Sequence, residues 1–490
     1  MQRSKAETDE GVHPLGHGGT VDTDICIIGA GSGGLSVAAS TVLLGMKVVL
    51  IEKHLMGGDC LNTGCVPSKA LIAAARRAHE MRTAGPFGIM PVTPQVDPAA
   101  VNDHIRSVIA SVARNDTVER FTGMGVQVIQ APARFRDKNT VEAGDMLVKA
   151  FRFVIATGSS PAVPAIPGLD KVPYLTNESL FDVRETVGHL IVIGGGSVGM
   201  EMAQAYRRLG AKVTVLEGLK ALGRDDPELS DVVLKHVRAE GLDVREGVRV
   251  EGVSGWPGAV QVTLAGPEGL ATVEGTHLLV ATGRTPNVQG LNLEAAGIKY
   301  DSRGIMVSRG LVTSNRKVFA IGDVVGGQQF THVANYHAGI VFRRALFRLP
   351  AKVRSELIPW VTFTDPELAQ VGLTEDQARK MHGQIQVFRW PYHENDRAQA
   401  ERATDGLIKV VTDRKGRILG AGIVGREAGE LIQIWSLAIA QGLRITAMTQ
   451  WIAPYPTLGE ISKRAAMGTY ALSAGNPLVR KVVGVLRKLG

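Results

Sequence analysis

Two cysteines five positions apart are the residues of this chain best suited to chemistry. Cys60 and Cys65 lie within the stretch Gly57 to Lys69, and Gly64 stands directly before the second thiol. The 490-residue chain has only three cysteines, too few for a disulfide scaffold, so the pair is expected to be catalytic or metal-binding rather than structural. Zinc sites normally need a second pair of ligands at short spacing, and no further cysteine supplies one here. We therefore expect redox chemistry at this pair.

The residues after Cys65 predict a helix from Pro67 to about Arg82. Proline suits the first turn of a helix, where a backbone N–H would have no partner within the helix. A thiolate at Cys65 would then lie near a helix N-terminus, a position that lowers the pKa of a thiol.

A glycine-rich turn precedes the cysteine pair and has the pattern of a dinucleotide-binding loop. The apolar run 24–28 leads into Gly29, Gly31 and Gly34, then into a helical pattern and a second apolar run that ends at Glu52. In this strand–turn–helix–strand setting, the glycines let backbone N–H groups approach a pyrophosphate at a helix N-terminus. Glu52 is placed to accept hydrogen bonds from a ribose.

The same pattern returns 165 positions later, from Gly29 to Gly194, and continues through Gly196 and Gly199 to Glu217. Each unit is followed by an Ala-Thr-Gly sequence, at 156–158 and at 281–283. Two dinucleotides and a dithiol in one chain indicate an electron relay, in which a nicotinamide gives a hydride, a flavin holds the electron pair and a disulfide receives it.

The acid at the end of the second unit bears on the choice of nicotinamide. The Glu217 carboxylate favours an unmodified ribose 2′-OH and would repel a 2′-phosphate, so NADH is favoured over NADPH. Lys220 and Arg224 follow closely and could offset this preference.

Bulk composition excludes several classes of protein. The net charge is +8, and four of the basic residues lie in the last fifteen positions, which gives little support for nucleic-acid binding. No apolar run is long enough to predict a membrane span, and residues 1–20 lack the apolar core of a signal peptide. We therefore expect a cytoplasmic enzyme with a disordered lead over residues 1–21. A continuous helical pattern is also predicted over about residues 98–122.

The C-terminal part of the chain has a different pattern. From about residue 351, strand and helix signals without a phosphate-binding loop predict an α+β module that pairs with another subunit. Apolar residues in the tail fall on one face of a helix, interleaved with basic residues. They are Leu478, Val482, Val485, Leu486 and Leu489. Three interpretations stay open: docking on the protein itself, a weak contact with an anionic membrane surface, or a mobile tail.

In this order, the motifs resemble those of the class I pyridine nucleotide–disulfide oxidoreductases, such as dihydrolipoamide dehydrogenase, glutathione reductase and mercuric reductase. The resemblance covers about residues 22 to 470. It implies an α/β homodimer with two Rossmann-like dinucleotide-binding domains and a C-terminal α+β dimerisation domain. The implied segments are a lead (1–21), an FAD-binding domain (22–160 and 284–350), an NAD(P)-binding domain (161–283), a dimerisation domain (351–475) and a basic amphipathic tail (476–490).

The resemblance also implies roles for individual residues. Cys65 would be the thiol next to the flavin, and Cys60 the interchange thiol that meets the substrate. Lys69 would lie near the flavin, paired with Glu201. The further FAD-binding residues that it implies are Lys53, Gly58, Thr157, Gly158, Asp323 and Ala334. For the NAD(P) site, the resemblance implies Gly283 in addition to the second glycine loop and Glu217.

The chain departs from the resemblance at one catalytic position. The lipoamide and glutathione enzymes carry a His-Pro-x-x-x-Glu motif, whose histidine is the acid–base for the dithiol of the partner subunit. Here that position is Tyr455, while Glu460 is kept. Tyrosine has a reference pKa near ~10 and is a poor base at neutral pH. His337 is an alternative candidate for the missing acid–base.

The identity of the electron acceptor therefore stays open in the sequence. A disulfide-type acceptor is our first expectation. A soft metal ion, Hg(II) or Cu(II), is the alternative, because mercuric reductase also has tyrosine at the position of Tyr455. Against it, the C-terminal vicinal cysteines of that enzyme are absent, since no cysteine follows Cys65. Quinone or oxygen acceptors, and a membrane-associated or partner-binding redox sensor, are further alternatives.

Overall fold

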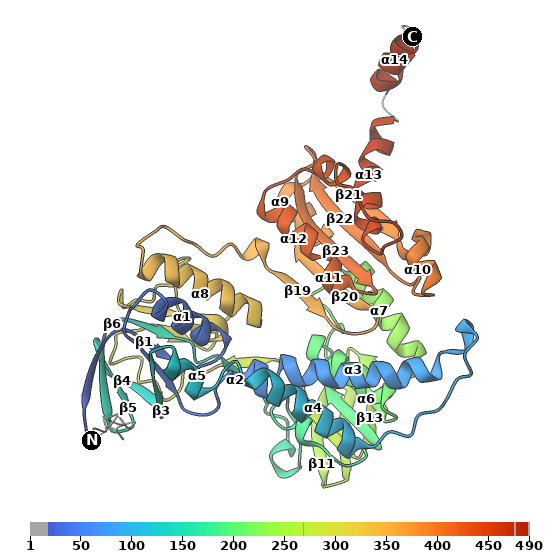
Figure 1. The fold of residues 1–490 in the computed structure, drawn as a ribbon. Coiled ribbons are helices and arrows are strands. Elements are labelled where there is room, and N and C mark those ends of the chain that lie inside the picture. The colour runs from blue at the N-terminus through green and yellow to red at the C-terminus, as the bar shows by residue number, and fades with distance from the viewer. Residues whose placement is uncertain (1–17, 268, 475–476, 489–490) are drawn as a thin grey trace, which may run out of the picture. The chain divides into compact units, whose positions relative to one another are not determined.

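The computed structural model describes residues 18–267, 269–474 and 477–488, which fall into two compact units. Unit 1 comprises residues 1–60, 113–160 and 285–353, and unit 2 comprises residues 61–112, 161–284 and 354–490. Figure 1 labels those elements for which there is room. The predicted lead lies outside the described residues as far as residue 17, and the first strand already begins at Thr20.

Unit 1 is built on one mixed sheet. Its strand order is β3-β2-β1-β6-β5-β4, with β18 on β6. The strands are β1 (Thr20–Ile28), β2 (Val48–Glu52), β3 (Val126–Gln130), β4 (Ala133–Asp137), β5 (Thr140–Ala143), β6 (Met146–Ile155) and β18 (Val318–Ala320). The parallel part places Ile27 beside Leu50 and Val154. All three side chains are fully buried, as expected for a parallel sheet covered on both faces.

Two helices from distant parts of the chain cover one face of this sheet. They are α1 (Ser32–Val42) and α8 (Thr331–Ala345), which lie side by side and share a core with β1. Their close approach depends on Gly33, because a Cβ there would lie 3.3 Å from the Cβ of Ala334. Cys26 faces the opposite core, where complete burial raises the pKa of its thiol and leaves it inert.

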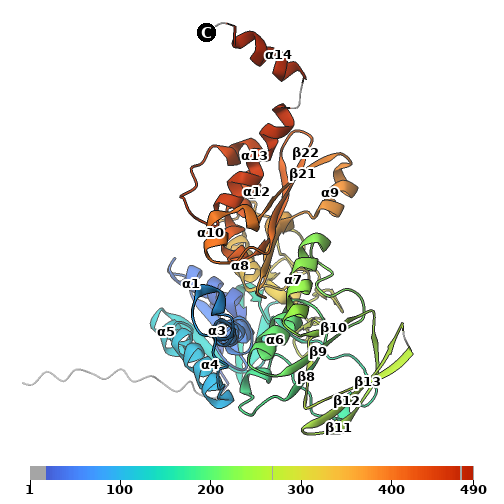
Figure 2. The same ribbon diagram turned by 90° about the vertical axis from the view of Figure 1, so that its right-hand side faces the viewer.

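Unit 2 contains a second parallel sheet of the same design. Its strand order is β10-β9-β8-β14, made of β8 (His189–Ile193), β9 (Lys212–Glu217), β10 (Asp243–Glu246) and β14 (His277–Val280). Helices α6 (Ser197–Arg208) and α7 (Pro227–Ala239) pack in its core. An antiparallel meander follows, visible in Figure 2, made of β11 (Arg249–Trp256), β12 (Ala259–Gly266) and β13 (Gly269–Gly275).

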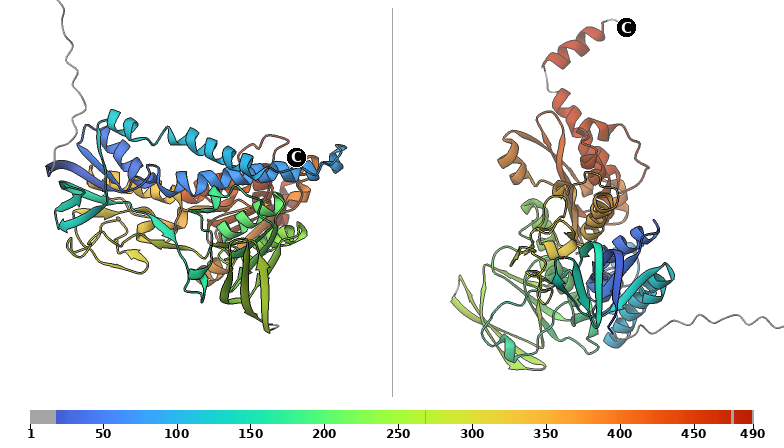
Figure 3. Two further views of the ribbon diagram at one scale, coloured as in Figure 1. Left: turned by 90° about the horizontal axis from the view of Figure 1, so that it is seen from below. Right: turned by 90° about the vertical axis from the view of Figure 1, so that its left-hand side faces the viewer.

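Residues 61–112 also belong to unit 2, although the sequence groups them with the FAD-binding segments. Helix α3 (Cys65–Arg82) places Ala70, Leu71 and Ala75 in the same apolar core as α6, and α4 (Pro98–Ala113) adds Ile105. The left panel of Figure 3 shows both helices in blue. The continuous helix predicted over 98–122 is wrong, because α4 ends at Ala113 and α5 begins at Val118 with Thr117 as its N-cap.

The C-terminal module of unit 2 is the predicted α+β fold. Its sheet has the order β19-β20-β23-β22-β21. These strands are β19 (Pro359–Thr362), β20 (Glu367–Gly372), β21 (Ile385–Pro391), β22 (Leu407–Asp413) and β23 (Ile418–Gly425). Helices α12 (Gln433–Ala440) and α13 (Glu460–Ala474) pack on it, and the buried Trp435 indole donates a hydrogen bond to Ser462 Oγ at 3.0 Å. The last described helix is α14 (Pro477–Leu486). Among the described helices, none has the length and apolar character needed to cross a bilayer.

Candidate functional site

The first glycine loop requires glycine at two positions, Gly29 and Gly34. Gly29 has a φ of +104°, and a Cβ there would lie 2.4 Å from the carbonyl oxygen of Ala156. A Cβ on Gly34 would lie 1.9 Å from the carbonyl oxygen of Gly29. Gly31 is the N-cap of α1 and has no side chain to bond the first helical amides. The loop therefore leaves a helix N-terminus suited to a pyrophosphate, and the residues fit the dinucleotide that the sequence predicts.

The second loop repeats this geometry residue for residue. Gly194 has a φ of +110°, and its Cβ would lie 2.5 Å from the carbonyl oxygen of Ala281. A Cβ on Gly199 would lie 2.0 Å from the carbonyl oxygen of Gly194, and Gly196 is the N-cap of α6. Gly283 has a φ of +128° and open space where a side chain would stand. The internal duplication predicted from the sequence is thus also a duplication of backbone conformation.

The two acids at the strand ends are held in the same way. Each carboxylate accepts one backbone N–H on each oxygen. The donors are Ala30 (2.7 Å) and His54 (2.8 Å) for Glu52, and Gly195 (2.7 Å) and Leu219 (2.9 Å) for Glu217. Each oxygen keeps acceptor capacity, so a ribose hydroxyl can still bind. Lys53, beside Glu52, is exposed.

The stretch Gly57 to Lys69, which carries the two thiols, begins against the first glycine loop. Gly31 and Gly57 form a parallel bridge, and a Cβ on Gly58 would lie 2.8 Å from the Cα of Gly31. Gly58 also begins the short helix α2 (Gly58–Asn62), which carries Cys60 two residues later. The chain that leads to the first thiol is therefore fixed to the predicted pyrophosphate site.

The remaining predicted FAD residues come together at the ends of neighbouring strands in unit 1. Thr157 follows β6, and its hydroxyl donates to the carbonyl oxygen of Asn287 at 2.8 Å. Asp323 follows β18 and accepts a hydrogen bond from Ser159 Oγ at 2.6 Å. Gly158 accepts the N–H of Asn287 at 3.0 Å. Sequence reasoning missed Asn287 and Ser159, although both lie close to residues that it identified.

Helix α8 holds the turn that carries Asp323. Ala334 is in its first turn, and His337 Nδ1 accepts the backbone N–H of Gly322 at 3.2 Å. The His337 side chain is buried, and desolvation lowers its pKa to about 4. At neutral pH this imidazole is therefore uncharged and serves the backbone of the turn, which speaks against His337 as the missing acid–base.

The two thiols occupy different local settings. Cys65 is the first residue of α3 and is exposed, whereas Cys60 is half-buried. The predicted position of Cys65 at a helix N-terminus is confirmed. The dipole of an 18-residue helix favours the negative charge of a thiolate there.

Lys69 and Glu201 form an ion pair, with 2.7 Å between Lys69 Nζ and Glu201 Oε2. The Glu201 side chain is only 6% exposed, and its Oε1 accepts the backbone N–H of Phe363 at 3.0 Å. Lys69 Nζ also lies 4.3 Å from the centroid of the Phe363 ring. Glu201 is therefore a fixed anchor for Lys69 rather than a surface acid. Phe363 directly follows β19, and sequence reasoning gave it no role.

Tyr455 is exposed, and its hydroxyl donates a hydrogen bond to Asp396 Oδ2 at 2.9 Å. This bond and the negative charge of Asp396 raise the pKa of Tyr455, with a smaller contribution from Glu460. Glu460 is the first residue of α13, and Asp396 is the first residue of α10 (Asp396–Ala400). The tyrosine is therefore held as a neutral phenol. No sequence signal pointed to Asp396 as its partner.

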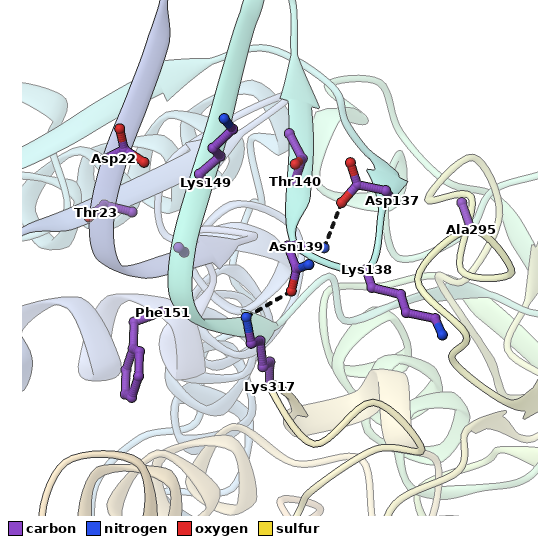
Figure 4. A pocket seen from close by; sticks show the side chains of 11 residues that line it. Asp22, Thr23, Asp137, Lys138, Asn139, Thr140, Lys149, Phe151, Ala295 and Lys317 are labelled. Atoms are coloured by element: carbon purple, nitrogen blue, oxygen red, sulfur yellow. Dashed lines mark hydrogen bonds between the residues drawn. The ribbon is translucent and has the colours of Figure 1, made fainter.

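A cavity of about 820 Å³ in unit 1 is separate from all of these residues. Figure 4 shows its lining, which includes Asp22, Asn139 and Lys149. Lys317 Nζ donates to Asn139 Oδ1 at 2.8 Å, and the Asn139 N–H donates to Asp137. The cavity lies beside Asp22 and Thr23 in the first half of β1 and beside residues 149–151 at the middle of β6, whereas the predicted nucleotide-binding residues follow the carboxyl ends of both strands. It is not the flavin site.

Comparison with known proteins identifies the class. Residues 23–338 match the pyridine nucleotide-disulphide oxidoreductase family, and residues 358–466 match its dimerisation domain. The chain belongs to this family and is an oxidoreductase that uses FAD and a pyridine nucleotide. The dimerisation domain supports a homodimer.

Relatives within the family are named for different activities. A mercuric reductase from Bacillus cereus is 37% identical over 454 residues, covering 92% of this chain and 72% of that protein. A dihydrolipoyl dehydrogenase from Geobacillus stearothermophilus is 34% identical over 455 residues, covering 91% and 96%. The solved Cu(II) complex of the HOCl-induced flavoprotein disulfide reductase RclA from Escherichia coli aligns with a TM-score of 0.81 at 28% identity, covering 91% and 99%.

Proposed function

We propose that this enzyme uses NADH to reduce a soft metal ion, Hg(II) or Cu(II), at the Cys60–Cys65 pair. The observation that carries this proposal is the state of Tyr455, whose phenol is neutral and engaged with Asp396. Relatives named mercuric reductase and the Cu(II) complex of RclA support the same class of acceptor.

Proton balance explains why the tyrosine matters. Reduction of a disulfide by NADH consumes one proton and yields two thiols, so an acid must protonate the leaving thiolate. Reduction of Hg(II) to Hg(0) takes both electrons of the hydride and releases one proton, so no acid is needed. For Cu(II), two ions become Cu(I) for each NADH. A phenol with a raised pKa is a poor acid–base but a suitable neighbour for thiolate–metal exchange.

Different residues of the chain would carry out the separate steps of metal reduction. Gly29, Gly31, Gly34, Glu52 and the strand-end residues would hold FAD, which would supply a carrier for the electron pair between the nicotinamide and the Cys60–Cys65 disulfide. Cys65, at the start of α3, is stabilised as a thiolate, and Cys60 meets the incoming ion. Lys69, anchored by Glu201, supplies a fixed positive charge beside this chemistry.

The preference for NADH rests on Glu217. Its carboxylate is pinned by two backbone amides and cannot easily move away from a 2′-phosphate. The predicted division into FAD-binding, NAD(P)-binding and dimerisation domains is kept in this proposal, with residues 61–112 as the segment that carries Cys65 and Lys69.

A disulfide-type acceptor is the second candidate function. It is favoured by the absence of any cysteine after Cys65, which leaves no second thiol pair in this chain to hand over a metal ion. The similarity to dihydrolipoyl dehydrogenase supports it as well.

A steady-state screen separates the two candidates. NADH oxidation is measured with Hg(II) or Cu(II) supplied without thiol ligands, as chelates with oxygen and nitrogen ligands, and separately with small disulfides. We expect stimulation by a metal ion that is lost in Cys60→Ser and in Cys65→Ser, with Cys26→Ala as the thiol-removing control that keeps activity. Stimulation by disulfides alone would replace the metal proposal with the second candidate.

A further inference from the structure

The C-terminal helix α14 (Pro477–Leu486) has two distinct faces. At 100° per residue, its apolar side chains fall within an arc of about 160°. They are Leu478, Val479, Val482, Val483, Val485 and Leu486, each between 39% and 69% exposed. Backbone hydrogen bonds from Arg487 to Val483 and from Lys488 to Val485 extend the helical turn beyond Leu486.

The opposite arc of α14 is basic. Arg480 and Lys481, together with Arg487 and Lys488, project from the arc that the apolar residues leave. The chain from Ile461 to Gly490 contains no aspartate or glutamate. Every charged side chain of the tail is therefore positive.

An isolated helix of this length is not stable in water. Helices shorter than about 12–15 residues are marginal on their own, so α14 needs a surface that accepts its apolar face. The right panel of Figure 3 shows α14 at the C-terminal end of the ribbon. The partner surface must accept valine and leucine side chains and must attract positive charge beside them. The boundary between acyl chains and anionic headgroups of a membrane has both properties.

We propose that α14 is a peripheral membrane anchor that binds an anionic lipid surface. It lies in the plane of the interface, with the apolar arc in the acyl region and the basic arc among the headgroups. The enzyme would bind reversibly, because one short helix buries little apolar area. Two copies of α14 in a homodimer would strengthen the attachment by avidity.

The test is co-sedimentation of the full-length, FAD-loaded enzyme with vesicles. We expect binding to phosphatidylcholine vesicles that contain phosphatidylglycerol, and little binding to pure phosphatidylcholine. A chain that ends at Ala474 should stay in the supernatant. Val482→Asp/Val485→Asp should abolish binding through the apolar arc, and Arg480→Gln/Lys481→Gln should weaken it roughly thirtyfold.

A matched control distinguishes an effect of net charge from an effect of the position of that charge in α14. Arg414→Gln/Lys415→Gln removes the same two charges from an exposed turn outside α14, and it should bind like the unmodified enzyme. NADH oxidation with a water-soluble acceptor should be equal in all variants, because the tail takes no part in the proposed chemistry. The membrane-binding test is therefore independent of the experiment that identifies the electron acceptor.

Three outcomes would overturn the proposal. They are no binding of the full-length enzyme to anionic vesicles, equal loss of binding in the turn control, and a change of oligomeric state on truncation at Ala474. The last outcome, measured by light scattering, would show that the apolar arc contacts a second copy of the chain instead of lipid.

Discussion

At the scale of single residues, the carboxylates that end β2 and β9 are held by equivalent pairs of backbone amides. With equivalent anchoring, our proposal distinguishes the two acids by the nucleotide that each would bind. This makes each a natural control for the other.

Glu217→Gln should reduce the preference for NADH over NADPH by about tenfold. The amide keeps the shape and one acceptor of the side chain but removes the charge that repels a 2′-phosphate. The measurement is the ratio of kcat/KM for the two nucleotides. Glu52→Gln, assayed at saturating FAD, should leave this ratio unchanged, and an unchanged ratio in Glu217→Gln would contradict the assignment.

Tyr455→His should raise the rate of disulfide reduction by about tenfold or more, because it supplies an acid–base that titrates near neutral pH. Asp396 would pair with the new imidazolium as it now pairs with the phenol. The measurement is NADH oxidation with a small disulfide, compared with Tyr455→Phe, in which no gain is expected. Equal rates in both variants would show that a missing acid–base is not what limits disulfide reduction.

Glu201→Gln should lower kcat by about tenfold without changing the KM for the acceptor, because Lys69 loses its charged anchor but the substrate-facing thiol is untouched. Phe363→Leu should cost less, roughly threefold, since it removes only the ring from Lys69. Glu80→Gln, which breaks the exposed Arg77–Glu80 pair on the same helix α3, is the matched control. A fall in kcat for the control equal to that of Glu201→Gln would show that the Lys69–Glu201 pair has no special role.

At the scale of elements, one buried lysine joins the N-terminus of α7 to the C-terminal sheet. Lys409 on β22 is 6% exposed, and its Nζ lies 2.9 Å from carboxylate oxygens of Asp226, Glu228 and Glu375. Arg389 on β21 pairs with two of the same acids. Burial acts to raise the pKa of Glu375, but hydrogen bonds from Lys409 and Arg379 outweigh it and lower that pKa to about 2.

Lys409→Met should destabilise the protein by about 3–5 kcal/mol at neutral pH, because three acids lose their shared cation in a buried place. The measurement is the apparent free energy of unfolding in urea, with the exposed Lys415→Met as control. A loss of less than about 1 kcal/mol would show that these acids do not depend on Lys409, with Arg389 sufficient for Glu228 and Glu375.

The same network predicts a pH dependence. The folded-state pKa of Glu375 lies below its ordinary value of 4.5, so its contribution to stability is complete above that pH and is lost as the pH falls toward about 2. The unmodified protein should therefore lose stability across this window. Lys409→Met should lose less there, because its carboxylates gain from protonation. Parallel curves for the two proteins would contradict this account.

At the scale of the whole molecule, the match of residues 358–466 to a dimerisation domain bears on the assembled enzyme. Light scattering should give a mass of about twice the 52.2 kDa of one chain. The chain that ends at Ala474 should remain a dimer, because α14 lies beyond the matched domain. A monomeric full-length enzyme would contradict the prediction and would remove the avidity expected for two membrane anchors.

The sequence alone determined the features that depend on local chemistry. Gly29 and Gly194 adopt backbone angles that side chains rarely tolerate, and their carbons approach backbone oxygens too closely for a Cβ, so the two loops could be recognised from glycine spacing. The duplication over 165 positions and the place of Cys65 at the start of a helix were readable for the same reason.

Only the tertiary structure decided which distant side chains act together. Lys69 and Glu201 are 132 positions apart, and their pairing was expected only through resemblance; Phe363 and Asp396 entered the site with no local signal at all. Residues 61–112 joined unit 2 because the apolar face of α3 packs with α6. Local periodicity states which face of an element is buried, but the partner of that face depends on how the whole chain closes its cores.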